Sequence, residues 1–79
     1  MSQLGRSEKF SSIKKGLIKL GLDYRSASKH DVATCPITNN KTTVPRHRTI
    51  KKHTVGSICD FLLENGYKES EIKKAFRWK

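Results

Sequence analysis

The sequence predicts an α+β fold in which helices cover one face of a three-stranded antiparallel sheet. Three observations support this prediction: apolar residues recur at helical spacing near both ends, β-branched residues dominate the middle, and the chain has 79 residues. A chain of this length buries only about 60% of the surface that it exposes when unfolded, which suits one small domain. We therefore expect a single domain over residues 1–79, with residues 1–8 as a flexible N-terminal extension.

The first predicted element is a helix over about residues 8–20. Its apolar residues recur at spacings of three, four and three and so lie on one stripe of an amphipathic helix: Phe10, Ile13, Leu17 and Leu20. Gly21 should end this helix, because glycine readily adopts the conformation that follows a helix. Gly16 costs the helix about 1 kcal/mol relative to Ala, and it indicates close packing against another element.

Three short strands should follow, because β-branched residues and alternating polarity replace the helical spacing. We expect them over residues 22–27, 29–35 and 41–47. Pro36 and the Asn39-Asn40 pair favour a turn in which one residue takes a positive φ, so the second and third strands should form a hairpin. Pro45 has no N–H for a sheet, and the third strand should therefore end near Val44.

The second helix is the strongest in the sequence, with Thr54 as its expected N-cap. Its apolar residues follow at i, i+3, i+4, i+7 and i+8: Val55, Ile58, Cys59, Leu62 and Leu63. Asn65-Gly66 should end it, and a short basic helix over about residues 69–77 should follow. Ile72, Ala75 and Phe76 are expected to face inward. This order of elements leaves the second face of the sheet available.

Basic residues outnumber acidic ones by 17 to 7, which gives a formal net charge of +10. The excess is concentrated in residues 24–53, where Asp31 is the single acidic residue among seven Lys and Arg. A surface of this charge indicates a polyanionic partner. The sequence has no run of 18 apolar residues, and its first residues lack the apolar stretch of a signal peptide. We therefore expect a cytoplasmic protein with no membrane partner.

The sequence does not predict a metal or another cofactor. Cys35 and Cys59 form no CxxC pair and are expected to be reduced thiols. A zinc site built from these cysteines with His47 and His53 would lack the paired spacing of zinc ligands. A magnesium-dependent nuclease needs clustered carboxylates, which the central region does not supply.

Histidines are the candidates for acid–base chemistry, because theirs is the one side chain with an unperturbed pKa near neutrality. His30 opens the second predicted strand in the basic region, although a histidine in such a place is more often an ordinary surface residue. Tyr24 and Trp78 could stack on unpaired bases. Tyr24 could equally belong to the core, and Trp78 lies next to the C-terminus, where the chain tends to fray.

A cationic connection leads into the second helix, and its side chains could hold phosphates together with the N–H groups at the start of that helix. The alternative is a solvated basic loop, which charge runs often are. The residues predicted to bind RNA or phosphate are Lys29, Arg46, His47, Arg48, Lys51 and Lys52.

Three short motifs occur in order along the centre of the chain. Residues 27–30 read Ala-Ser-Lys-His, residues 43–47 read Thr-Val-Pro-Arg-His, and residues 50–58 read Ile-Lys-Lys-His-Thr-Val-Gly-Ser-Ile. In this order and spacing, the chain resembles the HicA family of toxins over about residues 10–66. The family's corresponding segments are a Gly-Ser-x-His or Gly-Lys-His strand entrance, a TVPRH segment and an IKKGTLRSI helix opening.

The resemblance implies a fold like that of double-stranded-RNA-binding domains and activity as an mRNA endoribonuclease of a toxin–antitoxin system. It matches His30 to the catalytic histidine of the family, and it implies a HicB-like antitoxin that masks the site. The expected reaction is metal-independent: His30 takes a proton from a ribose 2′-OH, which attacks the adjacent phosphate.

The chain departs from the family pattern at several positions. The family's loop glycine is replaced by Ala27 or Ser28, and Asp31 stands where many members have a second histidine. An alignment shifted by one residue would match Lys29 to the catalytic position of some members. His53 replaces the usual glycine before the second helix, and we expect no catalytic role for it.

A non-catalytic RNA-binding module is the competing interpretation, because phosphate contacts alone would account for the net charge. It predicts salt-sensitive binding that leaves RNA intact. A third interpretation is a structural protein that coats nucleic acid or associates with the ribosome. Such a protein would tolerate substitution of His30 but not of Arg46 and Lys52.

Overall fold

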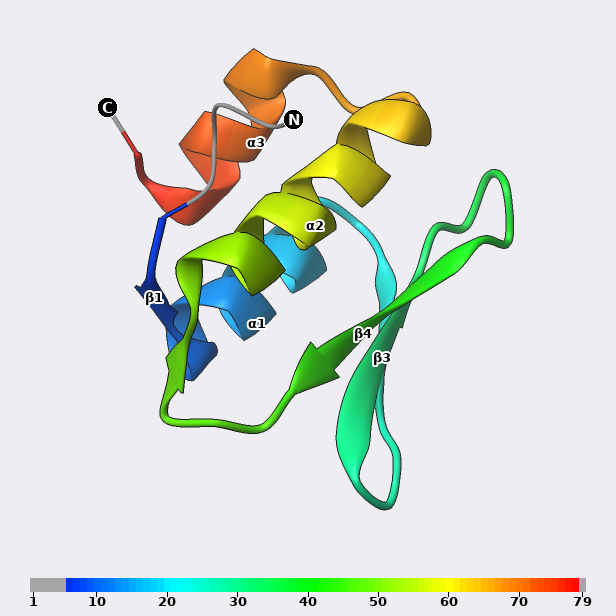
Figure 1. Cartoon of the computed structure of the whole chain (residues 1–79). Helices are drawn as coiled ribbons and strands as arrows, with labels where there is room; N and C mark the ends of the chain where they lie inside the picture. Colours follow the sequence, from blue (N-terminus) through cyan, green and yellow to red (C-terminus); the bar gives the residue numbers. More distant parts are fainter. Residues whose placement is uncertain (1–5, 79) are drawn as a thin grey trace.

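Three helices and a three-stranded antiparallel sheet make up the computed structural model, which describes residues 6–78 (Figure 1). The central strand of the sheet is β3 (His30–Thr34), which pairs with β2 (Asp23–Ser26) on one side and with β4 (Lys41–Pro45) on the other. The helices lie to one side of it: α1 (Phe10–Lys19), α2 (Lys52–Glu64) and α3 (Glu69–Phe76). The predicted α+β class, the order of these elements and the C-terminal helix are confirmed. None of the helices within residues 6–78 combines the length and apolar character that crossing a bilayer requires.

A second, two-stranded sheet was not predicted. In it, β1 (Glu8–Lys9) pairs antiparallel with β5 (Thr49–Ile50), just before α2. Because Glu8 and Lys9 belong to this sheet, α1 begins at Phe10 rather than near residue 8. Of the expected flexible extension, Glu8 lies in β1, whereas residues 1–5 lie outside the described part of the chain.

The predicted apolar stripe of α1 faces the core, where Ile13 and Leu17 are completely buried. Gly16 lies on the same face, and a Cβ atom at this position would collide with the ring of Phe76 in α3. The close packing that the sequence predicted at Gly16 is therefore confirmed. The helix ends before Gly21, which has a φ of 93°, as expected for a residue that follows a helix.

The predicted hairpin joins β3 to β4. His30 lies opposite Pro45, and Thr34 lies opposite Lys41. In the turn between them, Asn39 takes a φ of 62°, which is the positive φ expected from the asparagine pair. The strand β4 extends one residue beyond the predicted end at Val44, because an edge strand tolerates a proline without an N–H.

The helix α2 begins at Lys52, and its N-cap is Lys51, three residues before the predicted N-cap Thr54. Lys51 follows β5 directly in an extended conformation, and its carbonyl accepts the N–H groups of Thr54 and Val55 at 3.0 Å each. Thr54 therefore lies within the first helical turn instead of capping it. The predicted end of α2 is confirmed, since Asn65 is the C-cap and Gly66 has a φ of 95°.

The C-terminal end of the described chain is packed against its beginning. Trp78 is 8% exposed, and its ring centroid lies 5.1 Å from that of Phe76. Its indole N–H donates to the Glu8 carboxylate at 2.6 Å, and the Arg6 guanidinium lies 4.8 Å from the centre of its ring. The expectations that Trp78 frays or stacks on RNA bases are therefore wrong, because its ring is part of the core.

Strand alternation gives the sheet two different faces. Asp31, Ala33 and Val44 are buried on the face toward the helices. His30 and Val32 point to the opposite face, where they are half-buried. The side chain of His30 therefore lies on the other side of β3 from those of Asp31 and Ala33.

Candidate functional site

An open groove of about 340 Å³ runs between the hairpin strands and the first half of α2. Six of its eight lining residues carry an imidazole or a hydroxyl group, and the other two are Pro45 and Ile58. Its lining residues are His30, Thr42, Thr43, Pro45, His53, Thr54, Ser57 and Ile58. The groove offers acid–base and hydrogen-bonding groups together with an apolar surface.

His30 enters this groove from the first residue of β3. Its backbone carbonyl accepts the N–H of Ala27 at 2.9 Å, which closes the turn between β2 and β3. Its register partner is Pro45, which also lines the groove. The predicted strand entrance therefore fixes the backbone of His30, and the half-buried imidazole faces a space that a substrate can enter.

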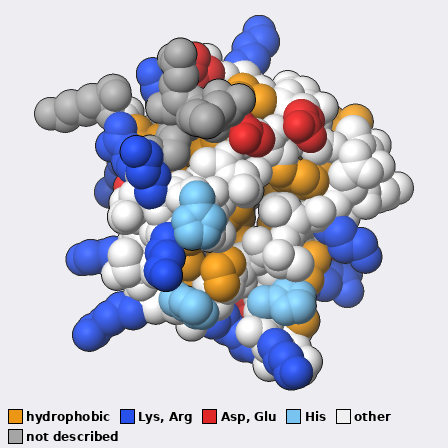
Figure 2. Space-filling view, viewed as in Figure 1, with side chains coloured by type: hydrophobic (Ala, Val, Ile, Leu, Met, Phe, Trp, Pro, Cys, Tyr) orange, Lys and Arg blue, Asp and Glu red, His pale blue; other side chains and the backbone are white. Residues whose placement is uncertain are grey.

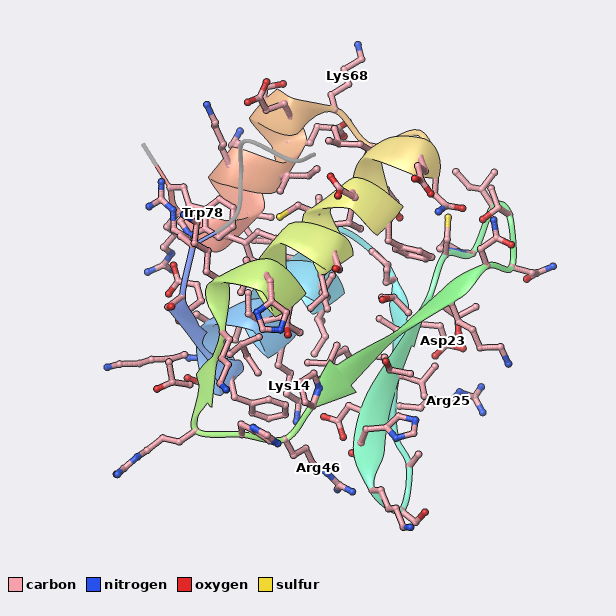
Figure 3. All side chains as sticks on the ribbon, in the orientation of Figure 1. Lys14, Asp23, Arg25, Arg46, Lys68 and Trp78 are labelled. Atoms are coloured by element: carbon pink, nitrogen blue, oxygen red, sulfur yellow. The ribbon has the colours of Figure 1, made fainter. Side chains whose placement is uncertain are left out.

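Arg46 holds the turn that precedes His30. One of its terminal nitrogens donates to the carbonyls of Ala27 at 2.5 Å and Ser28 at 2.7 Å, and its Nε lies 3.6 Å from Asp31 Oδ1 (Figure 3). A planar guanidinium presents five N–H donors in a fixed fork and can reach several acceptors in this way. The sequence predicted a phosphate contact here. The structure shows that the side chain is largely committed to contacts within the chain.

Asp31 lies directly behind His30, on the buried face of β3. Its side chain is 2% exposed; Tyr24 donates its hydroxyl to Oδ2 at 2.7 Å, and Arg46 faces Oδ1. Burial of the Tyr24 hydroxyl, together with the adjacent carboxylate, raises the pKa of Tyr24 above its ordinary value. Lys14 of α1 also lies over the Tyr24 ring, 5.7 Å from its centre. Tyr24 is thus a structural residue here.

These contacts join the three strands of the sheet beneath the catalytic candidate. Tyr24 comes from β2, Asp31 from β3 and Arg46 from the residue after β4. We refer to these three residues as the strand clamp. A buried carboxylate needs donors or an opposite charge to compensate for its lost hydration. Tyr24 donates to Oδ2, whereas Oδ1 has no hydrogen-bond partner among the described residues and only the Arg46 charge beside it. The position of His30 is therefore tied to all three strands.

The remaining predicted RNA-binding residues are exposed around this region. Lys29 belongs to the turn before His30, and His47 and Arg48 lie between β4 and β5. Lys51 and Lys52 stand at the start of α2, next to the groove residue His53. Figure 2 shows histidine side chains on the face that carries the start of α2, with Lys and Arg side chains around its edge. These cations surround the groove without forming its wall.

The groove contains residues that sequence reasoning left unassigned. His53 and Ser57 lie one turn apart on α2, and the Ser57 hydroxyl donates to the His53 carbonyl at 3.1 Å. Their i, i+4 spacing was visible in the sequence and could have placed them on one face of the helix. Their approach to His30 could not be read from the spacing, because it depends on how α2 packs beside β4.

The cysteines lie away from this groove and are buried as free thiols. Hydrogen bonds from Thr38 lower the pKa of Cys35, whereas burial raises that of Cys59 to about 12. Across residues 6–78, no three His, Cys, Asp or Glu side chains come together in a way that could hold a metal ion.

Comparisons of this chain with protein-family models, with curated proteins and with solved structures found no match. The resemblance to the HicA family therefore rests on the three motifs in the sequence.

Proposed function

We propose that this protein is the toxin of a HicA/HicB-type toxin–antitoxin system and a cytoplasmic endoribonuclease that cleaves mRNA without a metal ion. The observation that carries the proposal is the position of His30. A half-buried imidazole faces an open groove in a molecule with a net charge of +10. The motif that resembles the family's catalytic strand entrance ends at this same histidine.

His30 acts as the general base in the proposed reaction. It takes the proton of a ribose 2′-OH, and the freed oxygen attacks the adjacent phosphorus. The O2′–P bond forms and the P–O5′ bond breaks, which leaves a 2′,3′-cyclic phosphate and a 5′-hydroxyl end. DNA lacks the attacking hydroxyl and is therefore resistant.

The cations around the groove have two roles in this proposal. Lys29, Lys51 and Lys52 attract the RNA backbone and lower the energy of the negative charge that develops on the phosphate. The groove has the size of a small ligand pocket, for which about 300–1,000 Å³ is typical, and it suits a short length of one strand rather than a duplex.

A HicB-like antitoxin is the proposed protein partner. A partner that covers this groove would have to neutralise the exposed lysines around it, and its contact surface should therefore be acidic. Such a partner would prevent RNA from reaching the His30 imidazole and the surrounding cations. Co-expression of a small acidic protein encoded beside this one should relieve the growth arrest that the toxin causes.

The deciding experiment compares the purified protein with its His30→Ala variant on mRNA in the presence of EDTA. A general base contributes about 10²- to 10⁴-fold, so the variant should lose cleavage by that factor. A Lys68→Ala variant is the matched control, because Lys68 lies at the opposite end of the molecule from Arg46 (Figure 3). Equal cleavage by parent and His30→Ala, or no cleavage by a parent that is harmless when expressed, would contradict the proposal.

A non-catalytic RNA-binding module is the second candidate, and the exposure of the cations around the groove favours it. On this alternative, RNA stays intact and His30→Ala binds it as the parent does. Gel electrophoresis of RNA recovered from the binding reaction separates the two candidates.

A further inference from the structure

We propose that His53 is a second catalytic residue, which donates the proton required by the departing 5′-oxygen. This inference rests on the proposed ribonuclease function. It goes beyond the sequence interpretation, which gave His53 no catalytic role. The structure places His30 and His53 in the lining of one groove, although 22 positions and a complete hairpin separate them in the sequence.

The two histidines reach the groove from different elements. His30 is the first residue of β3, and His53 is the second residue of α2. Thr43 and Pro45 of β4 and Thr54 of the helix line the same groove. A phosphodiester bound in the groove can therefore meet an imidazole from the sheet and an imidazole from the helix.

The chemistry requires both a base and an acid. Attack by O2′ needs a base, but the P–O5′ bond breaks slowly unless the departing alkoxide receives a proton. Two histidines supply these functions when one is neutral and the other protonated. His53 gives its proton to O5′ while His30 takes one from O2′, so the proton count of the enzyme is unchanged.

The test separates proton donation from RNA binding by changing the leaving group. Parent, His53→Ala and His30→Ala proteins are compared in EDTA on an RNA oligonucleotide and on uridine 3′-(4-nitrophenyl phosphate). The nitrophenolate of the second substrate departs without a proton. His53→Ala should lose about 10²- to 10⁴-fold on RNA and retain nearly all activity on the nitrophenyl ester. His30→Ala should lose activity on both substrates.

Three results would overturn the inference. If His53→Ala cleaves RNA at the parental rate, His53 has no catalytic role, but the function of His30 stands. If His53→Ala loses the same factor on both substrates, His53 binds or positions RNA instead of donating a proton. If the parent cleaves neither substrate, the ribonuclease function fails together with this inference. His53 is exposed, and unchanged thermal unfolding of His53→Ala would show that the fold is intact.

Discussion

At the residue scale, the strand clamp explains why Asp31 occupies a position at which the resembled family often has a second histidine. The carboxylate is buried, accepts a hydrogen bond from Tyr24 and faces Arg46. A second histidine here would point to the core face of the sheet, away from the groove. In this chain Asp31 helps to hold His30 in place, and the second imidazole of the groove comes from His53 of α2.

The hydrogen bond between Tyr24 and Asp31 predicts a specific dependence of stability on pH. The Tyr24→Phe variant should be less stable at neutral pH by about 1–3 kcal/mol, because Asp31 loses a buried donor. Above pH 10, the unfolded chain releases the tyrosine proton while the folded chain retains it, since the pKa of Tyr24 is raised in the fold. The unfolded state then binds fewer protons, and the free energy of unfolding of the parent falls with rising pH.

The Tyr24→Phe variant has no tyrosine proton to release at this position. The difference in the free energy of unfolding between the parent and this variant should therefore decrease between pH 10 and 12. Urea denaturation at a series of pH values measures it. Tyr67→Phe is a useful comparison, because burial also raises the pKa of Tyr67, but that residue does not contact Asp31. A deficit that stays constant across this pH range would contradict the assignment.

At the element scale, local signals predicted most of the fold. The apolar stripes of Ile13 and Leu17 in α1 and of Ile58 and Leu62 in α2 marked their buried faces, and the Asn39 turn marked the hairpin. The β1–β5 sheet was missed because each strand has two residues, too few to show any periodicity. The start of α2 was also expected too late in the chain. The helix follows directly after β5 and the N-cap Lys51, and β5 itself could not be recognised in the sequence.

The candidate site could likewise be predicted only in part from the sequence. His30 could be assigned to a strand entrance and to a sheet face from alternation alone. The contacts of Arg46 with the turn and the approach of His53 to the groove depend on residues far apart in the chain. No local pattern encodes such contacts, because they arise only when the sheet and α2 pack together.

The contact between α1 and α3 provides the prediction at this scale. Gly16→Ala should destabilise the protein by about 1–3 kcal/mol, because the added methyl group overpacks the Phe76 ring. Helix propensity alone predicts the opposite, a gain of about 1 kcal/mol. Thermal or urea unfolding measures the difference. The exposed α1 residue Ser11 provides the matched control, since Ser11→Ala should change stability by no more than about 0.5 kcal/mol.

Phe76→Leu in the Gly16→Ala background tests the cause of this loss. If the ring is responsible, the smaller side chain should recover part of the stability, and the two substitutions should not be additive. Additive losses would show that Gly16 is required for a reason other than its contact with the Phe76 ring.

At the scale of the whole molecule, the distribution of charge decides how RNA approaches. Positive residues surround the groove, whereas in α3 Glu69 and Glu71 balance the charges of Lys73 and Lys74. Lys73 of α3 is also paired with Glu69 at 3.5 Å. The molecule therefore carries its excess positive charge mainly on the side of the sheet and of the start of α2.

This asymmetry predicts that three lysines near the groove account for a measurable part of the salt dependence of RNA binding. Replacing Lys29, Lys51 and Lys52 by Ala in the His30→Ala background, which keeps the RNA intact, should weaken binding. It should also reduce the slope of log affinity against log salt by about 2, because each phosphate contact to a single strand contributes about 0.7. Filter binding of a labelled single-stranded RNA at several salt concentrations measures this slope. Replacement of Lys68, Lys73 and Lys74 by Ala removes the same charge from α3 and its N-cap and should leave the slope nearly unchanged. None of these three residues belongs to the elements that carry the groove residues, whereas Lys29, Lys51 and Lys52 adjoin His30 and His53. Equal slopes for the two triple variants would mean that RNA binding depends on net charge alone and that the groove is not the binding site.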